Sequence, residues 1–150
     1  IAKVLLADIG TRVFYTQQIG YDTHANQGPI QPALLSDLSQ ALADFDTDLR
    51  EHDLSASVLT FVFTEFGRRV EENASLGTDH GTATPMFVIG AGVKGGLYGR
   101  HPSLTDLDDG NLKMTTDFRR VYATMIEEWL GVNDSASILK GSFESLPLFA

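Results

Sequence analysis

The chain has 150 residues, of which 43% are hydrophobic and 21% charged, a composition typical of one globular domain. Its formal net charge of -9 argues against nucleic acid and anionic membranes as partners, because both are polyanionic. No apolar run reaches membrane-spanning length, and no signal-peptide pattern is present. Since the chain contains no cysteine, a metal site would have to use oxygen and imidazole ligands.

The chain begins with a pattern typical of the last turns of a helix. Apolar residues stand at positions 1, 5, 6 and 9, and Gly10 follows where a helix C-cap is expected. Because the chain also begins without Met, we expect residues 1–150 to be the carboxyl-terminal part of one α/β domain. The remainder of that domain would then be a partner of this piece.

The segment Gly-Tyr-Asp-Thr-His-Ala-Asn-Gln at residues 20–27 combines a carboxylate with an imidazole. Residues 12–16 are β-branched and aromatic and predict a strand, so Asp22 and His24 fall in the loop after its carboxyl end. In open α/β sheets, sites are built at that edge. Side chains two positions apart in an extended segment point the same way, and a divalent metal would accept this pair.

The middle of the chain predicts a strand–helix–strand unit. Residues 33–52 predict a core-facing helix, because their apolar residues recur every three or four positions. Residues 58–64 are nearly all apolar, as in a central strand. Together with the predicted strand at 12–16, they would form a right-handed βαβ unit whose strand ends lie side by side. We therefore expect Glu65 to lie near the segment 20–27.

Residues 67–85 are polar and small and predict a long loop, and residues 86–90 predict a third strand. Asp79 and His80 precede this strand, whereas Glu65 follows its own. For these side chains to meet, strand 86–90 must run antiparallel to the others, or the loop must double back. The predicted fold class is α/β, with a mixed, mostly parallel sheet flanked by helices.

The last third of the chain predicts a loop and then a helix. Residues 90–110 are rich in glycine and aspartate, which indicates turns with a short hairpin. A helix is predicted from Thr116 as the N-cap, with Asp117 in its first turn, to a stop at Gly131. The apolar tail would then pack back as an irregular or short helical segment.

The polar segments at 20–27, 64–69 and 77–82 could deliver their ionisable side chains to one edge of the sheet. The candidate metal ligands are Asp22, His24, Glu65, Asp79 and His80. One or two divalent cations would suit this set; zinc or manganese is favoured, and magnesium or calcium is compatible with fewer imidazoles. In a hydrolase the metal would polarise an ester oxygen and lower the pKa of an attacking water. The planar fork of Arg68 could clamp a phosphate or sulfate oxyanion.

Each candidate also has an ordinary structural interpretation. His24 could be a solvated loop residue, and Arg68 a surface residue. Glu65 could form an ion pair with Arg68 or Arg69 at the end of its strand. Asp79 and His80 could form a turn in which the imidazole bonds to a neighbour.

The chain resembles the carboxyl-terminal half of the DUF1501 family, a bacterial group usually placed in the alkaline phosphatase and sulfatase superfamily. The resemblance rests on ordered blocks that cover almost the whole chain, including GYDTHANQ, TEFGRR, GTDHGTA, PMFVIGAG and DFRRVYATMIEEWLG. It implies an alkaline phosphatase-like fold in which Asp22, His24 and His80 hold one metal. Where the superfamily has an Asp-His pair for a second metal, this chain has Thr-Glu-Phe-Gly-Arg at 64–68, so Glu65 is the candidate.

The resemblance further implies that the nucleophile and its first metal ligand lie in an amino-terminal half. Many family members carry a twin-arginine export signal, which implies an extracytoplasmic, periplasmic location. One hypothesis is therefore a metal-dependent hydrolase acting on a small anionic phosphate or sulfate ester. The other is a non-catalytic exported protein that keeps the fold and at most a structural metal. Exposed strand edges would also favour self-association.

Overall fold

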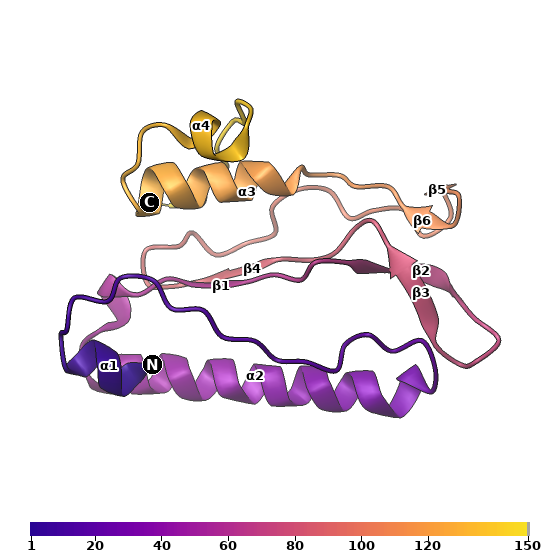
Figure 1. Ribbon diagram of the computed structural model, residues 1–150, viewed down its shortest axis with the longest axis horizontal. Coiled ribbons are helices and arrows are strands. Elements are labelled where there is room, and N and C mark those ends of the chain that lie inside the picture. The colour runs from indigo at the N-terminus through magenta and orange to yellow at the C-terminus, as the bar shows by residue number, and fades with distance from the viewer. Residues whose placement is uncertain (150) are drawn as a thin grey trace.

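The computed structural model describes residues 1–149 as short sheets between helices (Figure 1). The α/β composition predicted from the sequence is confirmed, whereas the mostly parallel sheet is not, because every strand pair among these residues is antiparallel. None of the helices in residues 1–149 is both long and apolar enough to span a membrane. The helices are α1 (Ala2–Leu6), α2 (Gln27–Glu51), the 3-10 turn η1 (Ser55–Ser57), α3 (Phe118–Thr124), the π-helical η2 (Met125–Trp129) and α4 (Ser135–Leu139). The strands are β1 (Thr60–Val62), β2 (Gly67–Glu72), β3 (Thr78–Gly81), β4 (Phe87–Ile89), β5 (Leu107–Asp108) and β6 (Asn111–Leu112).

The start of the chain differs from the sequence prediction. Helix α1 ends at Leu6 with Ala7 as its C-cap, so Gly10 does not cap it. The predicted strand at 12–16 is wrong: this segment is an extended connection that runs beside α2 (Figure 1). Its side chains have high β propensity, but a strand also needs a hydrogen-bonded neighbour, and none of the described strands pairs with it.

Helix α2 begins six residues earlier than the predicted start at residue 33. Pro29 stands in the first turn, where backbone N–H groups lack helical partners anyway, so the proline removes no hydrogen bond there. Pro32 lies inside the helix, six residues after its N-cap Asn26, and its side chain is exposed to solvent. The predicted apolar stripe is confirmed in part: Leu34, Leu38, Leu42 and Phe45 are half-buried and Leu49 is buried, whereas Leu35 and Ala41 are exposed.

Strands β1 and β4 form an antiparallel pair between α2 and α3, with Thr60 opposite Ile89 and Val62 opposite Phe87. Of the two arrangements open from the sequence, the antiparallel one is therefore confirmed. Figure 1 shows α2 on one side of this pair and α3 on the other. The buried core lies on the α3 side, where burial of apolar side chains supplies the main stabilising term. Its buried members are Val121, Met125, Leu146 and Leu148, with Leu59, Phe61, Met86, Val88 and Phe149 packed against them.

The stretch predicted as a long loop at 67–85 instead contains the hairpin β2–β3, in which Arg68 is opposite His80. Because β1 and β4 are antiparallel, the end of β1 and the start of β4 lie at one edge. The connecting hairpin therefore projects from that edge (Figure 1). A second hairpin, β5–β6, turns at Asp109 and Gly110, whose positive φ angles of 47° and 80° suit a tight two-residue turn. This confirms the short hairpin predicted within the glycine-rich region.

Helix α3 begins one residue later than predicted. Its N-cap is Asp117, not Thr116, because the Asp117 carboxylate accepts a hydrogen bond from the backbone N–H of Arg119. The helical path continues through η2 to Trp129, and Gly131 follows with a φ of +69°. This agrees with the predicted stop at Gly131.

Candidate metal centre

The loop before α2 is held against the turn of the β2–β3 hairpin by backbone hydrogen bonds. The N–H of Asn26 donates to the carbonyl of Ser75 at 3.0 Å, and the N–H of Gln27 donates to Leu76 at 2.8 Å. These contacts satisfy N–H groups at the start of α2 that have no partner within the helix. They also fix the loop that carries Asp22 and His24 beside the strand that carries His80.

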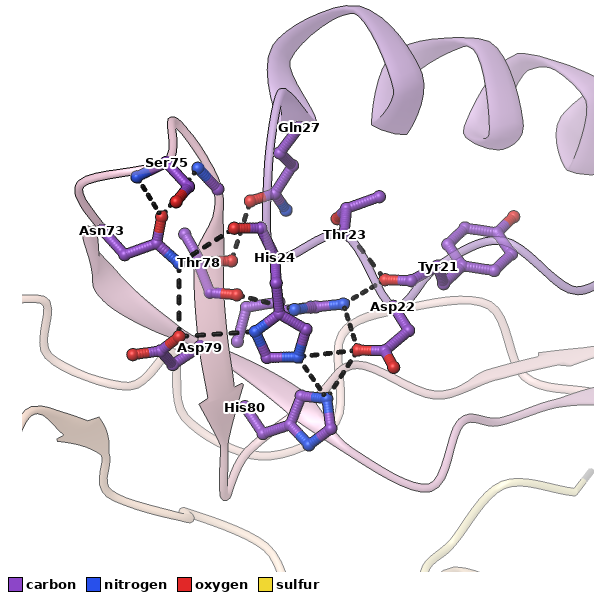
Figure 2. A network of polar contacts seen from close by, with 12 residues as sticks. Tyr21, Asp22, Thr23, His24, Gln27, Asn73, Ser75, Thr78, Asp79 and His80 are labelled. Atoms are coloured by element: carbon purple, nitrogen blue, oxygen red, sulfur yellow. Dashed lines mark hydrogen bonds and ion pairs between the residues drawn. The ribbon is translucent and has the colours of Figure 1, made fainter.

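Asp22, His24 and His80 converge on one point, as Figure 2 shows. Asp22 Oδ1 lies 2.9 Å from His24 Nε2 and 2.7 Å from His80 Nε2. The two Nε2 atoms are 3.1 Å apart. Of the five predicted metal ligands, the structure therefore gathers three into one group of potential donors.

The size of this triangle matches a metal-binding face. For an ion about 2.1 Å from its ligands, adjacent ligand atoms are about 3.0 Å apart in an octahedron and about 3.4 Å apart in a tetrahedron. The three separations of 2.7, 2.9 and 3.1 Å are those of an octahedral face. Two imidazoles and one carboxylate on one face leave the opposite coordination positions open.

The second nitrogen of His24 faces another carboxylate. His24 Nδ1 lies 3.4 Å from Asp79 Oδ1, so Nδ1–H can donate to this carboxylate when Nε2 binds a cation. Nε2 is then an acceptor, and its 2.9 Å contact with Asp22 Oδ1 joins two acceptors that repel each other unless a cation or proton lies between them. The donor set therefore fits a divalent cation. Asp79 lies next to Nδ1, on the side of the ring away from Nε2, where carboxylates typically contact metal-binding histidines.

Asn73 links Asp79 to the loop, and sequence reasoning missed it. Its side-chain N–H group donates to Asp79 Oδ1 at 3.2 Å and to the His24 carbonyl at 3.1 Å. Its side-chain oxygen accepts from the N–H groups of Ser75 and Gly77. The signal was the run Asn-Ala-Ser-Leu-Gly at 73–77, whose first and last residues are typical of a tight turn between strands.

Arg68 supports the site from β2. Its guanidinium donates to the carbonyl of Tyr21, to the carbonyl of Thr78 at 2.7 Å and to Asp22 Oδ1 at 3.5 Å. The side chain is only 15% exposed. Through these contacts Arg68 holds the loop at Tyr21 and Asp22 against strand β3. Its role in binding an oxyanion stays a prediction.

Phe66 contributes a second support that sequence reasoning did not identify. Its ring stacks on the His80 imidazole, with centroids 3.9 Å apart and planes 12° apart. The Arg68 guanidinium also contacts this ring, 5.1 Å from the Phe66 centroid. The aromatic ring therefore restricts the orientation of His80.

Glu65 does not join the group of donors. Its side chain is exposed, and its carboxylate accepts from the neighbouring Thr64 hydroxyl at 3.4 Å. The ion pair considered for Glu65 is not formed either, because Arg68 contacts Asp22 and Arg69 lies 4.0 Å from Asp109. The antiparallel pairing explains this placement, since Glu65 lies in the bend that leads from β1 into the hairpin rather than beside a parallel strand end.

The ionisation of both carboxylates favours cation binding. The hydrogen bond with His80 is the largest cause that lowers the pKa of Asp22, and the charges of His24, His80 and Arg68 add to it. The Asn73 amide is the largest cause that lowers the pKa of Asp79, followed by His24. The side chains of Asp22, His24 and His80 are 62%, 48% and 47% exposed, so the site opens to solvent.

The family model described as "Protein of unknown function (DUF1501)" matches residues 1–143. No curated protein and no solved structure matches the chain.

Proposed function

Since the chain belongs to the DUF1501 family, whose description states no activity, we propose a function from its own residues: a metal-dependent hydrolase of small phosphate or sulfate esters. Asp22, His24 and His80 would hold one divalent ion. The observation that carries the proposal is the triangle of donor atoms with sides of 2.7, 2.9 and 3.1 Å. Zinc or manganese suits its two imidazoles better than magnesium or calcium.

The openness of the site favours a catalytic role. Structural zinc sites are usually closed by four protein ligands, whereas catalytic sites keep a position for water or substrate. Here three ligands gather, each about half exposed to solvent. When bound, the ion supplies positive charge that polarises an ester oxygen and lowers the pKa of a water. Asp22 and the two histidines orient the ion, and Arg68 and Phe66 hold Asp22 and His80 in place.

An extracytoplasmic location, which rests on the family resemblance alone, belongs to the same proposal, as does the finer fold assignment to an alkaline phosphatase-like domain. The support for this fold assignment is the order of elements: a loop with two candidate ligands, the long helix α2, strand β1 and then the hairpin that carries the third ligand. A small anionic ester would approach the cation from the solvent side.

A second candidate is a non-catalytic protein with one structural ion. It is favoured by the placement of Glu65, because the donor group found within residues 1–149 holds ligands for one ion, not two. Two-metal sites stabilise both the attacking and the leaving oxygen of the ester, whereas a single ion contacts them less completely.

The test combines metal analysis with activity assays on protein purified without chelators. We expect about one equivalent of zinc or manganese, and hydrolysis of 4-nitrophenyl phosphate or 4-nitrophenyl sulfate that a chelator abolishes. His24→Ala and His80→Ala should lose both metal and activity, while His101→Ala serves as the matched control on an exposed loop histidine. Bound metal without turnover would support the structural candidate, and wild-type protein that takes up no metal would overturn both.

A further inference from the structure

Asp79 is poorly restrained by its contact with His24 alone. Its carboxylate is 57% exposed, and the distance from Oδ1 to His24 Nδ1 is 3.4 Å, at the long end for a hydrogen bond. An exposed aspartate has several rotamers of similar energy, so one long contact would hold it for only part of the time. A second contact at the same oxygen would be needed to keep it behind the imidazole.

Asn73 provides that second contact from a position that is itself fixed. Two backbone N–H groups, those of Ser75 at 2.9 Å and Gly77 at 3.1 Å, point at its side-chain oxygen. Since backbone N–H groups only donate, this assigns the oxygen and leaves the amide N–H₂ facing Asp79 and the His24 carbonyl (Figure 2). All four contacts lie within hydrogen-bonding distance, so the amide has one stable orientation.

We propose that Asn73 is the positioning residue of the site: its amide holds Asp79 beside His24 Nδ1 and holds the His24 carbonyl against the hairpin turn, so that His24 Nε2 stays directed toward Asp22 and His80. The inference rests on the proposed function only for the identity of the cation. Asn73 also ties the His24 backbone to the hairpin turn, so the same residue restrains both ends of this side chain. Outer partners of metal-binding histidines typically change metal affinity 10–100-fold.

The first readout is the side-chain rotamer of His24 in the metal-free protein, measured from three-bond χ1 couplings. Wild-type protein should show one rotamer, because both the backbone and the imidazole of His24 are restrained. Asn73→Ser keeps a hydroxyl acceptor for the turn but no donor that reaches Asp79, so its His24 should average over several rotamers. Asn73→Asp keeps both acceptors of the turn and tests the same loss in a second variant. A single unchanged rotamer in both variants would overturn the inference.

The second readout is the affinity for Zn²⁺ or Mn²⁺, measured by calorimetry. Asn73→Ser should bind at least about tenfold more weakly than wild type. Because Asn73 acts in part through Asp79, the double variant Asn73→Ser/Asp79→Ala should lose less affinity than the sum of the two single losses. Fully additive losses would overturn the inference. Asn133→Ser, an exposed residue far along the chain, is the control and should bind as wild type does.

The two proposals fail in different ways. A wild-type protein that binds no metal removes the proposed function, while the rotamer of His24 in Asn73→Ser still tests the positioning role. A wild-type protein that binds metal with an affinity unchanged in Asn73→Ser removes the positioning role alone.

Discussion

The Nε2 atoms of His24 and His80 lie 3.1 Å apart although 56 residues separate the two histidines in the sequence. Both atoms also lie within 2.9 Å of the same Asp22 oxygen. Such convergence of three basic or anionic atoms is costly unless protons or a cation lie among them, because their lone pairs repel. Metal binding at this point is therefore the property that the first prediction tests.

Asp22 and Glu65 should differ sharply in their effect on metal binding. Asp22→Asn removes the charged ligand from the triangle and should weaken affinity for Zn²⁺ or Mn²⁺ at least about tenfold, since even outer partners matter to that extent. Glu65→Gln should leave affinity within about twofold, because Glu65 lies outside the group of donors. Calorimetric titration of both variants measures the difference, and equal losses would show that Glu65 does reach the ion.

Arg68→Lys should destabilise the fold by about 1–3 kcal/mol, the usual cost of losing hydrogen bonds made by a charged group. A lysine cannot donate to the Tyr21 and Thr78 carbonyls at the same time as Asp22. Urea unfolding provides the measurement. Arg69→Lys is the matched control, because Arg69 is 39% exposed and its contact with Asp109 is long, at 4.0 Å. Lost turnover in Arg68→Lys with unchanged stability would instead favour direct contact with the substrate.

Gly77→Ala should separate the hairpin turn from the loop that carries His24. A Cβ at Gly77 would lie 2.3 Å from the carbonyl carbon of His24, a distance that backbone atoms cannot accommodate without moving. We expect a loss of about 1–3 kcal/mol in stability together with weaker metal binding. Gly92→Ala is the control, since a Cβ there would meet no atom within 4 Å. Thermal unfolding and metal titration check both; similar behaviour of the two variants would contradict the close packing.

Asp117 should make stability depend on pH in the acid range. The hydrogen bond from Arg119 is the largest cause that lowers the pKa of Asp117 in the folded protein. A lowered folded pKa means that the stabilisation is present above the unfolded pKa and is lost as the pH falls through the folded value. Asp117→Asn retains the N-cap but not the charge. Its free energy of unfolding should therefore be lower than that of wild type at neutral pH and equal to it at low pH.

Asp117→Ala should lose the cap itself, about 1 kcal/mol, both at neutral pH and at low pH. Urea titrations of wild type and the two variants from about pH 7 to about pH 3 test this pattern. If the stability difference between wild type and Asp117→Asn grew as the pH fell, the pKa of Asp117 would not be lowered in the folded protein.

The amino-acid sequence alone determined those features that depend on local chemistry. The amphipathic pattern of α2, the tight Asp109-Gly110 turn and the stop near Gly131 were predictable, because each depends on side-chain periodicity or on backbone preferences of a few neighbouring residues. The residue types around Asp22, His24 and His80 likewise indicated a cation site before any distance was known.

The tertiary structure decided which of these segments meet. Residues 12–16 have the composition of a strand but remain unpaired among residues 1–149, since strand formation depends on a distant hydrogen-bonding partner. The antiparallel pairing of β1 with β4 and the hairpin between them placed His80 beside His24 and left Glu65 outside. The support from Asn73 also became visible only there, because its contacts with Asp79 and His24 arise from folding a turn against a loop about 50 residues earlier in the chain.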